Sequence, residues 1–136
     1  MQLKELQFKE RGEASTDKKQ IYIVDDDESV CRALKILMTT YGFTVRTFLS
    51  AEEFFSAVPN SAPGCLVLDI HMPGLNGWEA RWRLFKSGSK RPIILITADQ
   101  SGDLKKQALK TGAVGLLQKP IDDRELAGLI HRASLN

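Results

Sequence analysis

The stretch that decides the fold runs from Ile21 to Glu28 and reads Ile-Tyr-Ile-Val-Asp-Asp-Asp-Glu (IYIVDDDE). Its four apolar residues are typical of a short strand that is buried on both faces of a sheet. Four acids follow directly, and two carboxylates about 4 Å apart repel each other by roughly 4 kcal/mol at an effective dielectric constant of about 20. Such a cluster stays ionised only where positive charge lies between its members. It therefore predicts a turn, a helix start or a metal site at the end of this strand.

The rest of the chain alternates between short apolar runs and segments with helical periodicity. The apolar or alternating runs predict five strands, at 21–24, 43–48, 65–68, 92–96 and 114–117. Helical spacing and capping residues predict five helices, at 28–41, 50–58, 77–86, 101–111 and 122–133. This alternation implies an α/β fold with a doubly wound, five-stranded parallel sheet and helices on both faces. The second strand alternates in polarity, so we expect it at or near an edge.

Composition is ordinary for one soluble globular domain, with 136 residues, 43% hydrophobic and 26% charged. No apolar run approaches the roughly 20 residues of a membrane span, and the chain start lacks the apolar core of a signal peptide. We therefore expect a cytoplasmic protein in which Cys31 and Cys65 are buried, reduced thiols. The net charge of +2 does not favour nucleic-acid binding. We expect a flexible leader or short helix at 1–20, the folded domain at 21–133 and a tail at 134–136.

Polar and charged groups end four of the five predicted strands. Asp25 and Asp26 follow the first strand, Asp69 the third, Thr97 the fourth and Lys119 the fifth. The carboxyl ends of parallel strands meet at one edge of the sheet, where ligands bind in folds of this class. Each group alone has a simple explanation, such as a helix cap, a turn acid or a solvated lysine. Together they predict a functional site at that edge.

Four blocks of the sequence resemble the receiver domain of two-component response regulators: IVDDDESV, LVLDIHMPGLNGWE, IILITA and GAVGLLQKPID. The blocks come in the order of the family, and the resemblance covers about residues 21 to 133. Among receivers, the chain is most similar to those that usually precede a helix-turn-helix output domain. The resemblance implies a flavodoxin-like strand order, 2-1-3-4-5.

The resemblance also implies a phosphorylation switch. Asp69 would be the phosphoacceptor and would take its phosphoryl group from a sensor histidine kinase or a histidine phosphotransfer protein. The implied ligands of Mg²⁺ are Asp25, Asp26, Asp69 and the backbone carbonyl of His71. A hard divalent cation would hold the acids together and neutralise the incoming phosphoryl oxygens.

The same resemblance implies that the hydroxyl of Thr97 donates a hydrogen bond to one phosphoryl oxygen and that the ammonium of Lys119 pairs with another. It also implies a cis peptide bond between Lys119 and Pro120. The domain would catalyse only its own phosphorylation and dephosphorylation, so it would be a signalling switch rather than an enzyme. A homodimer through the fourth helix, fifth strand and fifth helix is a family expectation, with no nucleic acid or membrane bound by this domain. Its cross-pairs would come from these charged residues: Lys105, Lys106, Lys110, Asp122, Asp123 and Arg124.

Leu116 departs from the family pattern, in which an aromatic residue usually stands three positions before the lysine. The usual coupling of that ring to the threonine cannot operate here in its ordinary form. His71 and Asp99 occupy positions that tune acyl-phosphate hydrolysis in the family, so they either orient water or are exposed loop side chains. Trp78 is expected in the core, while Trp82 is either a partner anchor or plain variation.

Three other functions are alternatives to the receiver. A pseudo-receiver would signal by protein contact without phosphorylation; Leu116 favours it, and the complete set of acids, threonine and lysine opposes it. A flavodoxin-like protein that binds FMN needs a phosphate loop rich in Ser, Thr and Gly after the first strand, where this chain has acids. A phosphatase with an Asp-x-Asp nucleophile motif is opposed by Asp69-Ile70-His71, which lacks the second acid.

Overall fold

A computed structural model describes residues 19–74, 76–100 and 102–134 of the chain. The leader or short helix expected at 1–20 falls on residues outside this range, apart from its last two positions. Of the expected tail, only Ser134 is described. Within these residues, no helix combines the length and the apolar character needed to cross a membrane.

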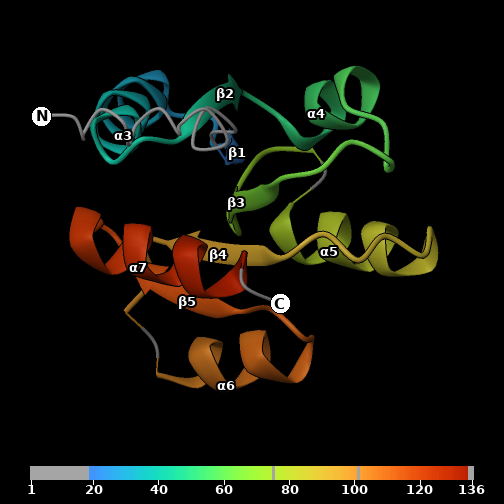
Figure 1. The fold of residues 1–136 in the computed structure, drawn as a ribbon. Coiled ribbons are helices and arrows are strands. Elements are labelled where there is room, and N and C mark those ends of the chain that lie inside the picture. Colours follow the sequence, from blue (N-terminus) through green and yellow to red (C-terminus); the bar gives the residue numbers. More distant parts are fainter. Residues whose placement is uncertain (1–18, 75, 101, 135–136) are drawn as a thin grey trace, which may run out of the picture.

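Five strands form one sheet in which every neighbouring pair is parallel (Figure 1). Their bounds are Gln20–Val24 for β1, Thr44–Phe48 for β2, Cys65–Asp69 for β3, Ile93–Thr97 for β4 and Gly115–Gln118 for β5. The strand order is β2-β1-β3-β4-β5, which confirms the expected flavodoxin-like order and places β2 at an edge. All residues of β3 and β4 are buried, as their continuous apolar runs predict.

Helices alternate with the strands and cover both faces of the sheet (Figure 1). Their bounds are Glu28–Thr40 for α3, Ala51–Ala57 for α4, Gly77–Lys86 for α5, Asp103–Lys110 for α6 and Asp123–Ala133 for α7. α3 and α7 pack on one face, and α4, α5 and α6 pack on the other. Within the described residues, each helix and strand begins and ends within two residues of its predicted bounds.

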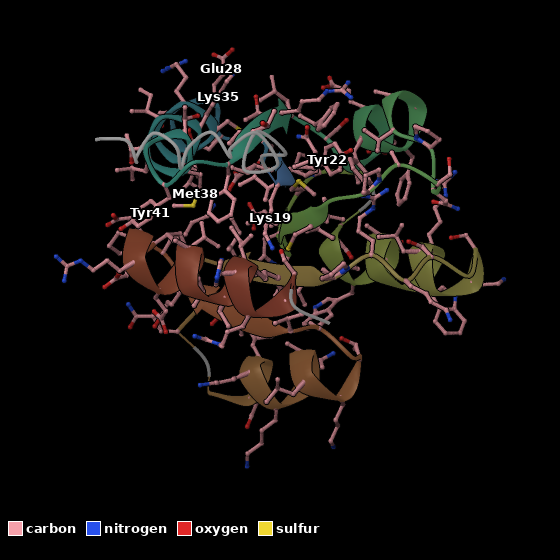
Figure 2. All side chains as sticks on the ribbon, viewed as in Figure 1. Lys19, Tyr22, Glu28, Lys35, Met38 and Tyr41 are labelled. Carbon is pink, nitrogen blue, oxygen red and sulfur yellow. The ribbon has the colours of Figure 1, made fainter. Side chains whose placement is uncertain are left out.

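Apolar side chains form one layer on each face of the sheet. Met38 is fully buried between α3 and α7, whereas Tyr22 lies on the face covered by α4 (Figure 2). The ring of Tyr22 contacts the ring of Phe54 edge-on, with centroids 5.4 Å apart. The guanidinium of Arg91 lies over both rings, at 5.0 Å and 5.5 Å from their centroids. Arg91 therefore completes this layer where β4 begins.

The acids after β1 are divided between two tasks. Asp27 is the N-cap of α3, because its carboxylate accepts hydrogen bonds from the backbone N–H groups of Ser29 and Val30 at 2.9 Å and 3.4 Å. The hydroxyl of Ser29 donates to the same oxygen, and these hydrogen bonds lower the pKa of Asp27. Capping by Asp27 leaves Asp25 and Asp26 available at the edge of the sheet.

Both cysteines are expected to resist alkylation in the folded protein. Cys31 and Cys65 are 3% and 4% exposed, and burial raises their thiol pKa values to about 11 and about 12. Since only the thiolate reacts readily, iodoacetamide at pH 8 should add nothing to the native chain within an hour and two groups in denaturant. Intact mass measures the additions, and modification of the native chain at the rate of free cysteine would contradict the structure.

Candidate functional site

The carboxyl edge of the sheet collects the side chains that the sequence placed there. Asp25 follows β1, Asp69 ends β3 and Thr97 ends β4, and they are 0%, 3% and 1% exposed. Among the described residues, these are the three polar side chains in the buried class. Since burial of unpaired polar groups costs free energy, the structure must compensate them locally.

Lys119 provides that compensation in the structure. Its ammonium lies 2.8 Å from Oδ2 of Asp25 and 3.2 Å from Oδ2 of Asp69, and its side chain is 20% exposed. Its backbone N–H donates to the carbonyl of Thr97 at 2.7 Å, and the bond to Pro120 is cis, as expected. Burial acts to lower the pKa of Lys119, but the two carboxylates outweigh it and raise that pKa. The positive charge between the acids is thus supplied by the chain itself.

Asp69 is held in place from two sides. Its Oδ1 accepts a hydrogen bond from the backbone N–H of His71 at 3.1 Å, and its Oδ2 accepts one from Lys119. Burial, and then the charge of Asp25, raise the pKa of Asp69 above its ordinary value, although Lys119 acts against this shift. The carboxylate is therefore fixed in orientation but costly to ionise.

Three carboxylates at this edge meet the requirements of a small hard cation. Asp25, Asp26 and Asp69 each offer an oxygen, and the three oxygens lie within 4.8 Å of one another. Oδ2 of Asp25 is buried, and it has no well-aligned hydrogen-bond donor among the described residues, since its contact with Lys119 is an ion pair only. Oxygen-only donors with one exposed member suit Mg²⁺, which retains several waters. The roles of these residues and of the His71 carbonyl as ligands stay predictions.

Thr97 and the loops around it complete the edge. The hydroxyl oxygen of Thr97 accepts a hydrogen bond from the backbone N–H of Asp99 at 3.0 Å, so its own hydrogen can still be donated. Nε2 of His71 lies 3.9 Å from a carboxylate oxygen of Asp99, with both side chains about half exposed. From the sequence, the two residues are treated together, but contact between their side chains is not predicted. The sequence does contain a signal for this contact: His71 stands two positions after the end of β3, Asp99 two positions after the end of β4, and the two strands are neighbours.

The structure also places the other residues that the sequence analysis singled out: Leu116, Trp78, Trp82 and Asp123. Leu116 is half-buried against the layer under α4, α5 and α6, and it lines an open cavity of about 430 Å³ that also contacts Thr97. Trp78 packs partly against the same layer, as expected, whereas Trp82 is 60% exposed. Asp123, a candidate for cross-pairs in a dimer, accepts a hydrogen bond from the hydroxyl of Tyr41 within the chain, and its role in a dimer stays a prediction.

In metal-free buffer at pH 7, Asp69→Asn is expected to unfold at higher urea than the wild type. The pKa of Asp69 is raised in the folded state, so its ionisation at pH 7 opposes folding. As the pH falls through the raised pKa toward the ordinary value, the wild-type carboxyl takes up its proton and the advantage of the variant shrinks. Urea unfolding with EDTA, from pH 7 to about pH 4, measures the difference. Glu28→Gln, at an exposed position, serves as the control, and a less stable Asp69→Asn at pH 7 would contradict the prediction.

Comparisons with known proteins place this geometry in a family. A family model for the response regulator receiver domain matches residues 21–131. The transcriptional regulatory protein FixJ of Bradyrhizobium diazoefficiens is 38% identical over 118 residues, which are 87% of this chain and 58% of FixJ. The response regulator protein TodT of Pseudomonas putida is 40% identical over 113 residues, which are 83% of this chain and 50% of TodT. The chain thus spans about half the length of these curated relatives.

Solved structures agree with the family model. The crystal structure described as FixJ-N has a TM-score of 0.80 and 34% sequence identity, and the match covers 88% of this chain and 96% of that one. The response regulator StyR has the same TM-score and 37% identity, over 88% of this chain and 61% of its own. The sheet order, the acids and the lysine at its carboxyl edge, and these similarities agree with one another. The chain belongs to the receiver domain family of two-component response regulators.

Proposed function

We propose that this receiver is a phosphorylation switch in which Asp69 accepts a phosphoryl group from the phosphohistidine of a sensor kinase or a phosphotransfer protein. The observation that carries the proposal is the convergence of Asp25, Asp69, Thr97 and Lys119 at one buried edge. No single structural task requires all four, whereas phosphoryl transfer to a carboxylate uses each of them.

In the proposed reaction, a carboxylate oxygen of Asp69 attacks the phosphorus atom of the donor. The phosphorus–nitrogen bond to the donor histidine breaks, its electron pair stays on the imidazole, and an acyl phosphate forms on Asp69. The hydrogen bond from the backbone N–H of His71 fixes the other oxygen, so the attacking oxygen is oriented in advance.

Charge at the edge has to be rearranged for this transfer. Asp25, Asp26 and Asp69, with the backbone carbonyl of His71, would hold Mg²⁺, which supplies neutralising charge for phosphoryl oxygens when bound. The ammonium of Lys119 would then exchange its contact with Oδ2 of Asp69 for one with a phosphoryl oxygen. The hydroxyl of Thr97 would donate its remaining hydrogen to another.

Release of the phosphoryl group would be hydrolysis by water that enters between the loops after β3 and β4. Because the phosphoryl group is accepted and released at Asp69 of the same chain, we infer that the domain acts only on itself and is a switch rather than an enzyme with a separate substrate. A homodimer through α6, β5 and α7 is part of the proposal, and sedimentation of the protein before and after phosphorylation tests it.

Intact mass after incubation with acetyl phosphate tests the proposed function. With Mg²⁺, the wild type should gain one phosphoryl group, and it should gain none with EDTA. Asp69→Asn should gain none in either buffer, whereas Asp103→Asn, which removes an exposed acid at the start of α6, should behave as the wild type. A folded wild type that gains no mass and binds no Mg²⁺ would overturn the proposal in favour of a pseudo-receiver.

A further inference from the structure

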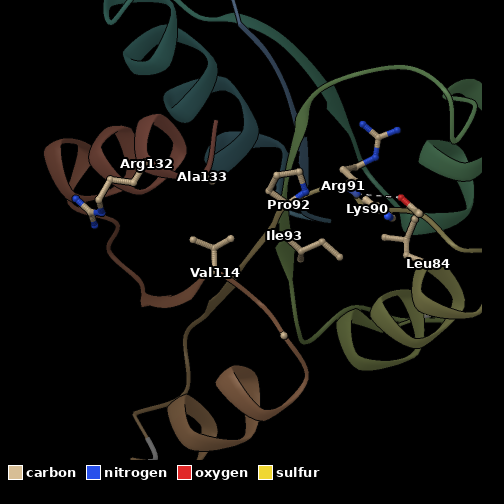
Figure 3. Close-up of a pocket in the computed structure, with 10 residues that line it drawn as sticks. Leu84, Lys90, Arg91, Pro92, Ile93, Val114, Arg132 and Ala133 are labelled. Carbon is tan, nitrogen blue, oxygen red and sulfur yellow. Dashed lines mark hydrogen bonds between the residues drawn. The ribbon is translucent and has the colours of Figure 1, made fainter. Parts of the chain in front are cut away.

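A second cavity lies at the edge of the sheet opposite to the acids, where β4 and β5 begin and α5 and α7 end (Figure 3). Its volume is about 380 Å³, which is within the range of ligand pockets. Leu84, Ile93 and Ala133 are buried and form an apolar floor with Val114, which is 36% exposed. The cavity can therefore take up an apolar side chain.

The charged residues that line this cavity are all basic: Lys90, Arg91 and Arg132. Arg91 is already engaged, since its guanidinium donates to the carbonyls of Gly64 and Pro59 at 2.9 Å and 3.2 Å. Lys90 and Arg132 are exposed on opposite sides of the cavity (Figure 3), and neither forms an ion pair with any residue that the structure describes. Two cations thus flank the apolar floor without a counter-charge among the described residues.

The surrounding sequence strengthens the positive charge at this edge. Between the last turn of α5 and the start of β4, residues 84–93 contain three basic residues, Lys86, Lys90 and Arg91, and no acid. The acids Asp25, Asp26 and Asp69 lie at the opposite edge, around the ammonium of Lys119, so the positive field of the cavity arises at the end of the sheet away from them. A field of this kind draws anionic groups toward the basic end over a distance of about a Debye length.

We propose that this cavity binds an acidic segment of a partner protein. One apolar side chain of the segment lies on Val114 and Ile93, and carboxylates on either side of it pair with Lys90 and Arg132. The concave apolar floor favours a peptide over nucleic acid, because a duplex binds through many phosphate contacts spread along a charged surface. The cavity lies at the edge opposite to Asp69, so the proposal does not rest on phosphorylation of that residue.

The proposal can be tested by nuclear magnetic resonance on the ¹⁵N-labelled protein. The probe is a capped pentapeptide, Glu-Asp-Leu-Glu-Asp, and its control is the uncharged Gln-Asn-Leu-Gln-Asn. The acidic peptide should shift the amides of Lys90, Ile93 and Val114 saturably, with an affinity at least about tenfold higher than that of the control. The variant Lys90→Gln/Arg132→Gln should weaken the acidic peptide about tenfold, which corresponds to about 1.4 kcal/mol.

A matched variant separates local pairing from overall charge. Lys105→Gln/Lys106→Gln removes the same charge from α6 and should leave the affinity within about twofold. Equal weakening by both double variants, equal binding of the two peptides, or no saturable shift at these amides would overturn the proposal. A duplex DNA fragment that shifts the same amides at lower concentration than the peptide would overturn it in favour of nucleic acid. Because Lys90 and Arg132 are exposed, their replacement should leave the circular dichroism spectrum unchanged.

Discussion

Lys119→Met is expected to lower the free energy of unfolding by about 3 kcal/mol in metal-free buffer at pH 7. The ammonium of Lys119 lies between the buried carboxylates of Asp25 and Asp69, and methionine leaves both without a positive partner. Removing one member of a buried ion pair typically costs about 3–5 kcal/mol, and the partial exposure of Lys119 places the expected loss at the lower end. Urea unfolding followed by circular dichroism measures it.

Millimolar Mg²⁺ should restore part of this loss, because a cation among Asp25, Asp26 and Asp69 replaces the missing charge. Lys106→Met, at an exposed position on α6, should change stability by no more than about 0.5 kcal/mol. A loss under about 1 kcal/mol for Lys119→Met would show that the acids do not rely on the lysine, and no response of that variant to Mg²⁺ would contradict a cation site at these acids.

Gly77→Ala is expected to cost about 2–3 kcal/mol of stability and to slow phosphorylation of Asp69. A Cβ atom at Gly77 would lie 2.6 Å from Cα of Ile70 and 2.7 Å from the carbonyl oxygen of Asp69. These are backbone atoms, which cannot rotate away from an added methyl group. The backbone N–H of Gly77 also donates a hydrogen bond to the carbonyl of Ile70 at 2.9 Å, which holds the two segments together. The loop after β3 must therefore shift, at the cost typical of an overpacked site, and Asp69 shifts with it.

Gly128→Ala is the matched control for this change. A Cβ at Gly128, inside α7, would meet only the flexible end of Arg132 at 3.4 Å. Alanine in a helix should stabilise the fold by about 0.5–1 kcal/mol, so the two substitutions are expected to have opposite signs. A neutral Gly77→Ala in thermal and urea unfolding would show that the loop can relax around the added methyl group.

The elements of the fold could be predicted because their causes are local. Apolar runs specify β3 and β4, and a side chain with a capping oxygen specifies the start of α3. The sequence favours Asp27 and Glu28 as the acids that open this helix, but it also allows Asp25 or Asp26 as the cap, because all carry a carboxylate. Only the turn of the backbone after β1 decides that Asp27 is the one that reaches the N–H groups of Ser29 and Val30.

The residues of the site could be named from the sequence, but their contacts could not. Strand ends indicate that Asp69 and Lys119 meet, yet the position of the ammonium depends on the path of the chain after β5. The packing of Gly77 against the backbone after β3 has no sequence pattern of its own. The basic cavity joins Lys90 to Arg132, which lie far apart in the sequence and are brought together only when α7 docks.

The contact between Asp69 and Lys119 spans 50 positions of the chain, and this separation has a consequence during synthesis on the ribosome. Four strands can pair before residue 119 has left the exit tunnel, but a nascent chain at that stage has Asp25 and Asp69 without their lysine. Because chains emerge from the amino terminus, the complete set of site residues should form only after the other four strands of this domain have emerged, when β5 joins the edge of β4. Under the proposed function, a nascent chain that lacks Lys119 should therefore not take up a phosphoryl group on Asp69.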